Sequence, residues 1–325
     1  LASVLVAAMN PGLGAKGGVL RPEMWVDVGA VSLIFVLSGL GLPLKELRSA
    51  ALNMRLNFLV QGFNLVAAPA IVFGLRQILE PLSNQWLGST AWLWDGLIVG
   101  ACVPTTVNMC VVLTQSAGGN VATALFNAVL GNLLGIVVTP LSILLLLNQA
   151  TSTASFLTVL KKLAIKVLVP VGLGQALRFT PVLAVRNKHK KLFSRASETL
   201  LLSVVFTTFC DTFSRRVSIG LPNLLGLMVC LPLLHLAALA TVFSLSRLPA
   251  LQLRRDEQVA AAFCASQKTV AFGIPLLKTI FEGNPSLALI SAPLLIYHPL
   301  QLVVGSALVP FAQRYIAQGE EGRGG

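Results

Sequence analysis

The sequence predicts an all-α polytopic membrane protein with ten transmembrane helices, the first of them truncated. The chain is 55% hydrophobic and only 11% charged, whereas a soluble domain carries about 25% charged residues. No Asp, Glu, Lys or Arg occurs in the 65 residues from Gly96 to Leu160, or in the 31 from Gly283 to Gln313. Because a membrane-spanning helix needs about 20 predominantly apolar residues, these runs predict several spans.

Proline, glycine and charged residues divide the chain into ten apolar segments. The first is only half a span, so we interpret it as the end of a truncated helix. The long charge-free run contains two segments, which "AGGN" (117–120) separates. The seventh is short, and the sixth carries lysines near one end that can reach the membrane interface. The predicted spans are 1–10, 24–43, 56–78, 95–116, 120–147, 155–178, 196–213, 220–245, 257–281 and 286–315.

The distribution of basic residues argues for a lipid bilayer as the partner and against nucleic acid. The net charge is +12, but Lys and Arg fall in short segments between apolar runs, as in "RNKHKKLFSR" (186–195). One side of the predicted topology collects 14 of them and the other 9. The richer side is expected to face the cytoplasm, which places both termini and the 178–195 connection there. We expect a multi-pass protein of the plasma membrane or a secretory-pathway membrane.

The sequence contains no pattern typical of an enzyme or a metal centre. The five cysteines lie inside apolar segments without metal-ligand or disulfide spacing, so we interpret them as small core residues. No nucleophile and base pair is apparent. We therefore expect neither catalytic residues, nor a metal, nor an organic cofactor.

The two halves of the chain resemble each other. "ACVPTTVNMCVVLTQSAGGN" (101–120) and "FCASQKTVAFGIPLLKTIFEGN" (263–284) each begin at a cysteine, pass a polar interruption and end in Gly-Asn. Five predicted helices fall in each half, and five is odd, so the second half would be inverted in the membrane relative to the first. We predict one repeat at 1–150, a second at 151–318 and a polar tail at 319–325.

Each repeat interrupts a predicted helix with polar residues, in "CVPTTVNMC" (102–110) and "ASQKTVAFGIP" (265–275). Broken helices at membrane depth are tolerated where protein or water satisfies the freed backbone groups. Half-helix ends that meet at the midplane bind ions and substrates. The alternative is two kinked helices without a site. The predicted crossover site consists of Thr105, Thr106, Asn108, Ser266, Gln267, Lys268 and Thr269.

Lys268 is the most informative of these residues. A charge at the bilayer centre costs about 2.5–3.5 kcal/mol on insertion scales, so we expect the carbonyl groups of the half-helix ends to compensate it. The expected further acceptors are Thr105, Thr106, Asn108 and Gln267. An ammonium is a compact monovalent cation with three donors. One hypothesis is that Lys268 replaces a bound sodium ion. The alternative is that it lines the cavity and attracts an anion.

Four further polar residues have two interpretations each. Asp211 either contributes to a site or caps a helix end. His298, which precedes a proline, either binds a ligand or is a structural hydrogen bonder. Gln61 and Asn64 on the third predicted helix either line the crossover from the side, with Gln61 a possible ion ligand, or have only a structural role.

Three longer stretches carry a resemblance to a known family: "LTQSAGGNVATALFNAVLGNLLGIVVTPL" (113–141), "TTFCDTF" (207–213) and "KTVAFGIPLLKTIFEGNPSLALISAPLLIYHPLQLVVGSALVP" (268–310). They resemble the sodium/bile acid cotransporter family, and within it the member-7-like branch. The resemblance implies two inverted five-helix repeats, a panel domain and a core domain, crossed breaks in the fourth and ninth helices, and alternating access. It also implies a link to cellular calcium homeostasis.

The resemblance also bears on the sodium sites. The family's ligands on the fifth helix correspond to Thr123, Asn127 and Asn132. Sodium-coupled relatives carry an acidic residue four positions before the glutamine that corresponds to Gln267. Here that position is Phe263, so a sodium site would be altered.

Two functions are consistent with the sequence. The first is a secondary transporter of an organic anion or similar metabolite. The second is a non-transporting regulator that acts on calcium entry through a partner protein. The polar interruptions favour the transporter, because polar groups at the midplane are costly to keep without a function.

Overall fold

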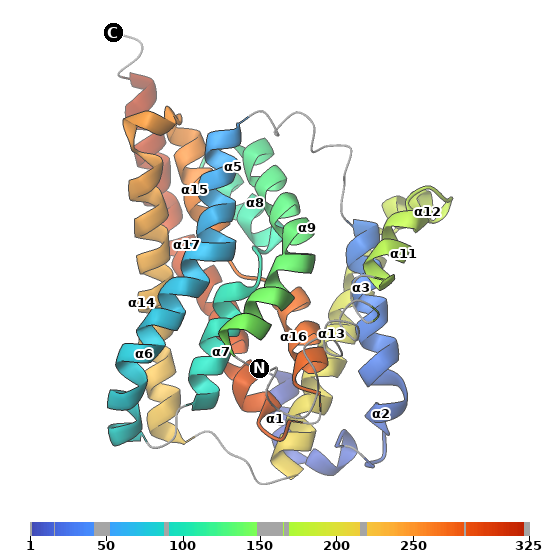
Figure 1. The fold of residues 1–325 in the computed structure, drawn as a ribbon. Helices are drawn as coiled ribbons and strands as arrows, with labels where there is room; N and C mark the ends of the chain where they lie inside the picture. The colour runs from blue at the N-terminus through green and yellow to red at the C-terminus, as the bar shows by residue number, and fades with distance from the viewer. Residues whose placement is uncertain are drawn as a thin grey trace. The chain divides into compact units, whose positions relative to one another are not determined.

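The computed structural model describes residues 2–15, 17–41, 53–87, 91–147, 165, 169–214, 220–282 and 284–321. These residues form helices, turns and short extended connections, and include no β-strand. Five helical segments among them are long and apolar enough to cross a membrane: Met54–Gln85, Val121–Leu146, Leu221–Ser246, Arg255–Ile280 and Leu287–Gly319. An all-helical, polytopic membrane protein is therefore the observed fold class (Figure 1).

The chain divides into two compact units. Unit 1 consists of 1–42, 144–220 and 271–292, and unit 2 consists of 43–143, 221–270 and 293–325. Each unit takes segments from both halves of the sequence, so the units are not the two predicted repeats. The repeats at 1–150 and 151–318 stay a prediction.

Unit 1 is built around the pair α3 (Val31–Gly41) and α11 (Val169–Leu177). The backbones approach so closely that a Cβ on Gly39 would lie 2.3 Å from the Val171 carbonyl oxygen. A side chain at Gly39 would force the two helices apart. The other elements of the unit are α1 (Ala2–Met9), α2 (Pro22–Trp25), α12 (Val182–Lys188), α13 (Lys190–Ser214) and α16 (Val270–Ile280).

Helix α13 corrects two expectations. The seventh span was predicted as a short helix at 196–213, and 178–195 as a connection. The structure begins α13 at Lys190 and makes it 25 residues long, and it places α12 inside the connection. A prediction from hydropathy does not include α12 and the first turns of α13, because their residues are charged. Charged residues nevertheless form stable helices when water solvates their side chains.

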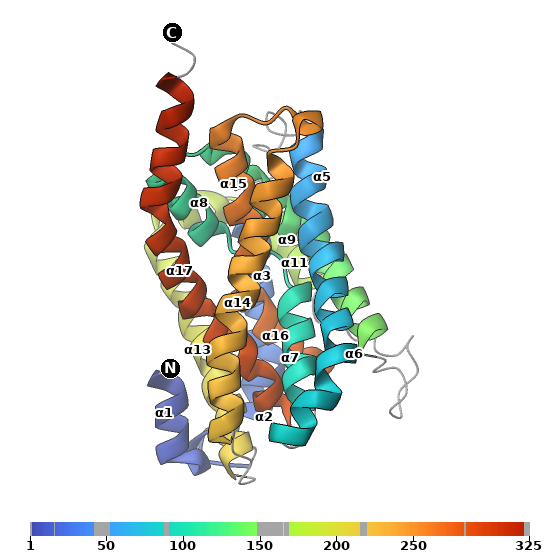
Figure 2. The same ribbon diagram turned by 90° about the vertical axis from the view of Figure 1, so that its left-hand side faces the viewer.

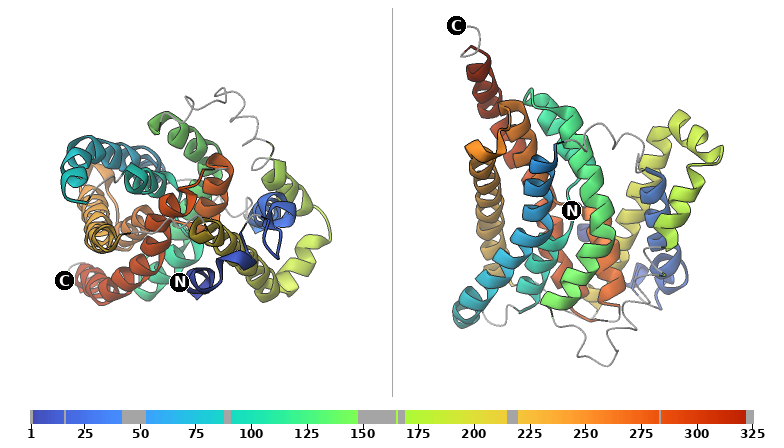
Figure 3. Two further views of the ribbon diagram at one scale, coloured as in Figure 1. Left: turned by 90° about the horizontal axis from the view of Figure 1, so that it is seen from below. Right: turned by 45° about the horizontal axis from the view of Figure 1, so that its top comes forward.

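Unit 2 contains eight α-helices in the part of the chain that is described. Several of them run roughly alongside one another (Figures 1 and 2). α14 packs on α15, and α15 on α5 and α8. The C-terminal end of α17 projects past the other helices of this unit (Figure 3). The eight helices of unit 2 are α5 (Met54–Gly62), α6 (Ala68–Leu87), α7 (Ala91–Cys102), α8 (Val107–Ser116), α9 (Val121–Leu146), α14 (Leu221–Ser246), α15 (Arg255–Ser266) and α17 (Leu287–Glu321).

Local sequence explains where several of these helices begin. The Asn53 side chain accepts a hydrogen bond from the Leu56 N–H at the start of α5. The Glu257 carboxylate accepts from the Arg254 N–H at the start of α15, at 2.9 Å. Asp256 and Glu257 also place negative charge at the positive end of the α15 dipole.

Both predicted helix breaks are confirmed. α7 ends at Cys102 and α8 begins at Val107, and α15 ends at Ser266 before α16 begins at Val270. Thr106 and Gln267 have extended backbones, with ψ of 116° and 137°. Pro104 lacks an amide hydrogen and disfavours a helical conformation at Val103. α7 and α8 consequently lie at opposite ends of unit 2 (Figure 1).

Candidate ion and substrate site at the crossed breaks

The two broken segments contact each other directly in unit 2. The Thr269 N–H donates to the Pro104 carbonyl at 3.0 Å, and the Thr106 hydroxyl donates to the Lys268 carbonyl at 2.7 Å. Residues 162 positions apart thus satisfy each other's freed backbone groups. Unpaired backbone groups would otherwise each cost several kcal/mol in a bilayer, which explains why the breaks meet.

Lys268 points its ammonium at the end of α7. Nζ lies 2.8 Å from the Ala101 carbonyl oxygen and 3.1 Å from that of Val103. It also donates to the carbonyl oxygen of Asn64 at 3.3 Å and to its side-chain oxygen. The expected acceptors Thr105, Thr106 and Gln267 do not bind it, because backbone oxygens at the end of α7 lie closer. The Lys268 side chain is only 6% exposed. The last carbonyls of a helix have no intrahelical partner and carry its partial negative charge, so this end attracts the ammonium.

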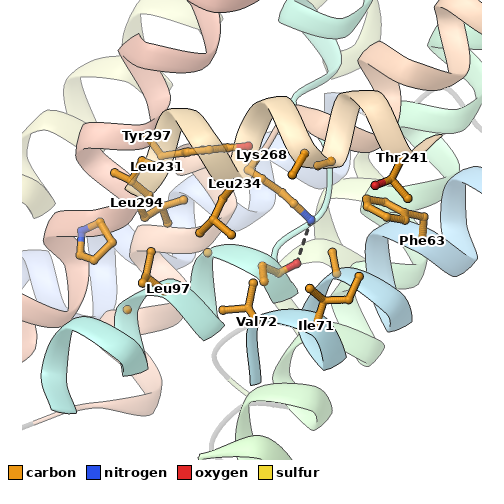
Figure 4. A pocket seen from close by; sticks show the side chains of 17 residues that line it. Phe63, Ile71, Val72, Leu97, Leu231, Leu234, Thr241, Lys268, Leu294 and Tyr297 are labelled. Carbon is orange, nitrogen blue, oxygen red and sulfur yellow. Dashed lines mark hydrogen bonds between the residues drawn. The ribbon is translucent and has the colours of Figure 1, made fainter. Parts of the chain in front are cut away.

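A cavity of about 130 Å³ adjoins the lysine. Its walls are mainly apolar, with Phe63, Leu97 and Leu294 among them. Figure 4 shows the Lys268 side chain extending across the pocket toward the carbonyl that it binds. The chemistry at this point therefore combines one fixed positive charge with a largely hydrophobic wall.

Gln301 on α17 holds the second break in place. Its Oε1 accepts from the Lys268 N–H at 2.7 Å, and its Nε2 donates to the Lys268 carbonyl at 2.8 Å. His298, one turn earlier, has its Nδ1 3.2 Å from Gln301 Nε2. His298 thus lies beside the predicted crossover, but sequence reasoning missed Gln301. The signal that could have identified Gln301 is a polar amide side chain in an otherwise apolar predicted span.

Tyr297 and His235 form a second contact that the sequence analysis missed. The Tyr297 hydroxyl donates to the Ser266 carbonyl at the end of α15, at 2.9 Å. His235 Nδ1 lies 2.8 Å from the same hydroxyl, and its side chain is fully buried. Since the hydroxyl has one hydrogen, His235 donates from Nδ1 when Tyr297 donates to Ser266.

Asn132 and Thr139 on α9 hold the first break in a similar way. Asn132 Nδ2 donates to the Thr105 carbonyl at 2.9 Å, and the Thr139 hydroxyl donates to the Cys102 carbonyl at 2.8 Å. A Cβ on Gly135 would lie 2.8 Å from Pro104 Cγ. Each break is therefore held by amide or hydroxyl groups of the long helix that follows it.

The remaining predicted ion ligands form a separate cluster. Gln61 Nε2 donates to the Asn127 carbonyl at 2.8 Å, and Asn127 Nδ2 donates to Asn57 Oδ1 at 2.9 Å and to the Thr123 carbonyl at 3.1 Å. Gln61 and Asn127 are thus brought together with Thr123. Asn132, in contrast, binds the break.

Several buried polar atoms of these residues have no partner in the described part of the chain. They are both side-chain polar atoms of Gln267, Gln61 Oε1 and Thr105 Oγ1. Gln267 is fully buried, and a buried polar group without a partner costs about 1–3 kcal/mol. A water, an ion or a polar ligand group would be needed to pair them.

The acidic ligand of a sodium site is absent from its corresponding position. Phe263 is 3% exposed and packs in an apolar cluster with Leu113, Leu239 and Val259. The described residues contain no group of three His, Cys, Asp or Glu that could hold a metal ion.

Two predicted residues receive no structural account of their side chains. Asn108 belongs to α8 and Asp211 to α13, but both side chains lie outside what the structure describes. Ser266 contributes its carbonyl to Tyr297, and its hydroxyl donates to the Phe263 carbonyl at 3.3 Å.

The chain is similar over nearly its whole length to known proteins. Residues 1–314 match the SBF-like CPA transporter family. Sodium/bile acid cotransporter 7 of Danio rerio is 38% identical over 315 residues, which are 97% of this chain and 92% of the relative. The protein of the same name from Mus musculus is 36% identical over 317 residues, which are 97% and 91% of the two chains.

A bacterial relative shows that the similarity extends beyond vertebrates. An uncharacterised protein of Pseudomonas aeruginosa is 30% identical over 318 residues, which are 97% of this chain and 90% of that protein. The helical fold, the crossed breaks and the match over nearly the whole length lead to one assignment. This chain belongs to the SBF-like CPA transporter family and is a multi-pass integral membrane protein.

Proposed function

We propose that this protein is a secondary-active transporter that moves an organic anion or similar metabolite by alternating access, with Lys268 in place of one coupling sodium ion. The observation that carries the proposal is the position of the Lys268 ammonium on the Ala101 and Val103 carbonyls. Half-helix C-terminal ends coordinate coupling cations in transporters with broken helices. The organic-anion class follows the names of the relatives.

The number of donors favours the sodium-substitute hypothesis over attraction of an anion. An ammonium has three N–H donors, and four protein oxygens surround Nζ within hydrogen-bond distance. No donor is then left to bind a substrate carboxylate or sulfate directly. Lys268 would hold the crossover together, and other groups beside the breaks would contact the substrate.

Several finer features belong to the same proposal. Unit 2, which contains the breaks, would be the core domain, and unit 1 the panel domain. Ten helices would form two inverted repeats, with both termini in the cytoplasm of a plasma-membrane or secretory-pathway protein. A role in calcium homeostasis, and a calcium-entry partner, rest on the family resemblance alone.

Uptake by the purified protein in liposomes tests the function. Vesicles would be offered a panel of labelled carboxylated and sulfated organic anions, with either an inward sodium gradient or choline in its place. We expect uptake of at least one anion above protein-free vesicles, at similar rates in sodium and choline. Similar rates are expected because the fixed ammonium already occupies the cation position.

Two outcomes would contradict this proposal in different ways. Uptake that depends strictly on sodium would contradict the hypothesis that Lys268 replaces the coupling ion, but it would still support a transport function. No uptake of any anion by well-folded protein would favour the regulator of calcium entry instead.

A further inference from the structure

Unit 2 also contains an open groove, distinct from the cavity at Lys268. It runs between α14, α15 and α17 and has a volume of about 400 Å³, which lies within the range of about 300–1,000 Å³ found for small-molecule sites. Its floor is apolar and includes small residues from each helix: Ala240, Ala262 and Ala312, beside Leu239, Val259 and Leu308. Small side chains on all three helices make the hollow.

An aromatic pair closes one part of this groove. The rings of Phe243 on α14 and Tyr315 on α17 meet edge to face, with centroids 5.0 Å apart. The Tyr315 hydroxyl donates to Gln258 Oε1 at 2.5 Å, which fixes its ring. The groove therefore has a rigid aromatic wall.

An arginine guanidinium lies over each of these two rings. The Arg247 guanidinium lies 5.8 Å from the centre of the Phe243 ring, and that of Arg255 lies 4.7 Å from the centre of the Tyr315 ring. Cations within about 6 Å of a ring centre are attracted to its face. The stacking holds two positive charges beside the apolar groove.

Both guanidiniums keep donors for a ligand. Arg255 uses one N–H to bind the Tyr315 carbonyl at 2.7 Å, and a guanidinium has five. In the described part of the chain neither Arg247 nor Arg255 pairs with a carboxylate, and the nearby Asp256 pairs with Arg254 instead. Planar guanidiniums suit phosphate oxygens because they can bind two at once.

We propose that this groove binds an anionic phospholipid, with its phosphate at Arg247 and Arg255 and an acyl chain along the floor of α14, α15 and α17. The apolar floor of the groove suits an acyl chain, and the two guanidiniums beside it suit a negatively charged head group. Basic pockets between membrane helices bind such head groups. Arg247 and Arg255 also lie on the side of the predicted topology that is richer in Lys and Arg. The site does not depend on the proposed transport function.

Native mass spectrometry of the purified full chain tests the proposal. Phosphatidylglycerol and phosphatidylcholine with the same acyl chains would be titrated in detergent. We expect tighter binding of phosphatidylglycerol to the wild type. Arg247→Gln should weaken it about fivefold, and the double variant with Arg255→Gln by about thirtyfold, since each basic residue near a membrane surface adds a similar factor.

Two controls separate the site from general charge and from free phosphate. Arg195→Gln removes an exposed arginine of α13 and should leave lipid binding unchanged. Ala312→Phe fills the groove and should abolish the preference while both arginines remain. Inorganic phosphate should bind far more weakly than the lipid, because it has no chain to occupy the floor.

The primary variant is chosen to keep the fold. The Arg247 side chain makes only the ring contact in the described structure, so its loss should leave gel-filtration and melting behaviour unchanged. Equal binding of the two lipids to the wild type would overturn the proposal. So would an unchanged preference in Arg247→Gln or in Ala312→Phe, or phosphate binding as tight as that of the lipid.

Discussion

At the scale of single residues, hydrogen-bond energies explain why Lys268 can remain at membrane depth. Placing it there costs about 2.5–3.5 kcal/mol on insertion scales. A hydrogen bond to a charged group contributes about 1.5–3 kcal/mol, and three N–H donors can each form one. The carbonyls of Ala101, Val103 and Asn64 therefore offset the cost of the charge.

Removing that ammonium should expose its role. We expect Lys268→Ala to lower the free energy of unfolding by about 2–3 kcal/mol, because the carbonyls at the end of α7 lose their cation. Sodium should restore part of this loss. Thermal unfolding in sodium and in choline buffer would measure both effects.

Lys278→Ala is the matched control on α16. Its ammonium lies 3.3 Å from the Thr207 hydroxyl, away from the breaks, so sodium should have no specific effect there. A Lys268→Ala protein as stable and active as the parent in sodium-free buffer would refute the role of the ammonium.

Gln301 allows a second prediction at this scale. Gln301→Leu leaves the N–H and carbonyl of Lys268 without the amide that bonds both. We expect a loss of about 2–4 kcal/mol in unfolding free energy, the sum of two buried groups left partly unpaired. Denaturation of the purified variant would measure it.

Gln313→Leu on the same helix is the comparison. Gln313 is exposed and makes one bond, to the Ser116 carbonyl at 2.8 Å. Exposed substitutions usually change stability by less than about 0.5 kcal/mol. Equal losses in the two variants would mean that Gln301 has no special role at the break.

At the scale of elements, the long helices position the breaks. α9 approaches the first break through Asn132, Thr139 and Gly135, and α17 approaches the second through Tyr297 and Gln301. The broken segments are thus fixed by side chains of continuous helices. A movement of either long helix would be transmitted to the break that it holds.

A glycine substitution tests this packing. Gly135→Ala places a Cβ 2.8 Å from Pro104 Cγ, so α9 and the break must separate. Overpacking of this kind costs about 1–3 kcal/mol, and we expect transport to fall with stability. Unfolding and uptake measured on the same preparation would show both.

Gly62→Ala provides the opposite case. No atom lies within 4 Å of the added Cβ at Gly62, and alanine is favoured over glycine in a helix by about 1 kcal/mol. That variant should be as stable as the parent or more so. If Gly135→Ala were equally harmless, the contact with Pro104 would not position the break.

At the scale of the whole molecule, orientation in the membrane follows from charge. The 14-to-9 distribution of Lys and Arg predicts that the 178–195 segment faces the cytoplasm. That segment is partly helical, since α12 and the first turns of α13 lie within it. Its basic residues remain largely exposed, as a segment facing an anionic leaflet requires.

Cysteine labelling of intact cells tests the orientation. Lys190→Cys should be protected from a membrane-impermeant maleimide, and Glu23→Cys, on the predicted opposite side, should react. Both positions are exposed. Four of the native cysteines are buried and Cys230 is half-buried, so the background is expected to be low. Labelling of Lys190→Cys from outside would reverse the topology.

The sequence by itself determined the membrane class, the positions of both breaks and the family. Hydropathy and interruptions are local, so they can be read from consecutive residues. Proline and consecutive polar residues predicted breaks near 103–107 and 265–269. The structure has them at 103–106 and 267–269. The sequence also shows that one charged residue, Lys268, lies at the centre of the second break.

Only the tertiary structure decided which groups satisfy those breaks. Lys268 meets Asn64 across 204 positions and Gln301 across 33, and no local pattern encodes such pairs. Tyr297 and His235 were missed for the same reason, because each looks like an ordinary residue of an apolar helix. Inside a membrane every freed backbone group needs a partner, and packing selects the side chain that supplies it.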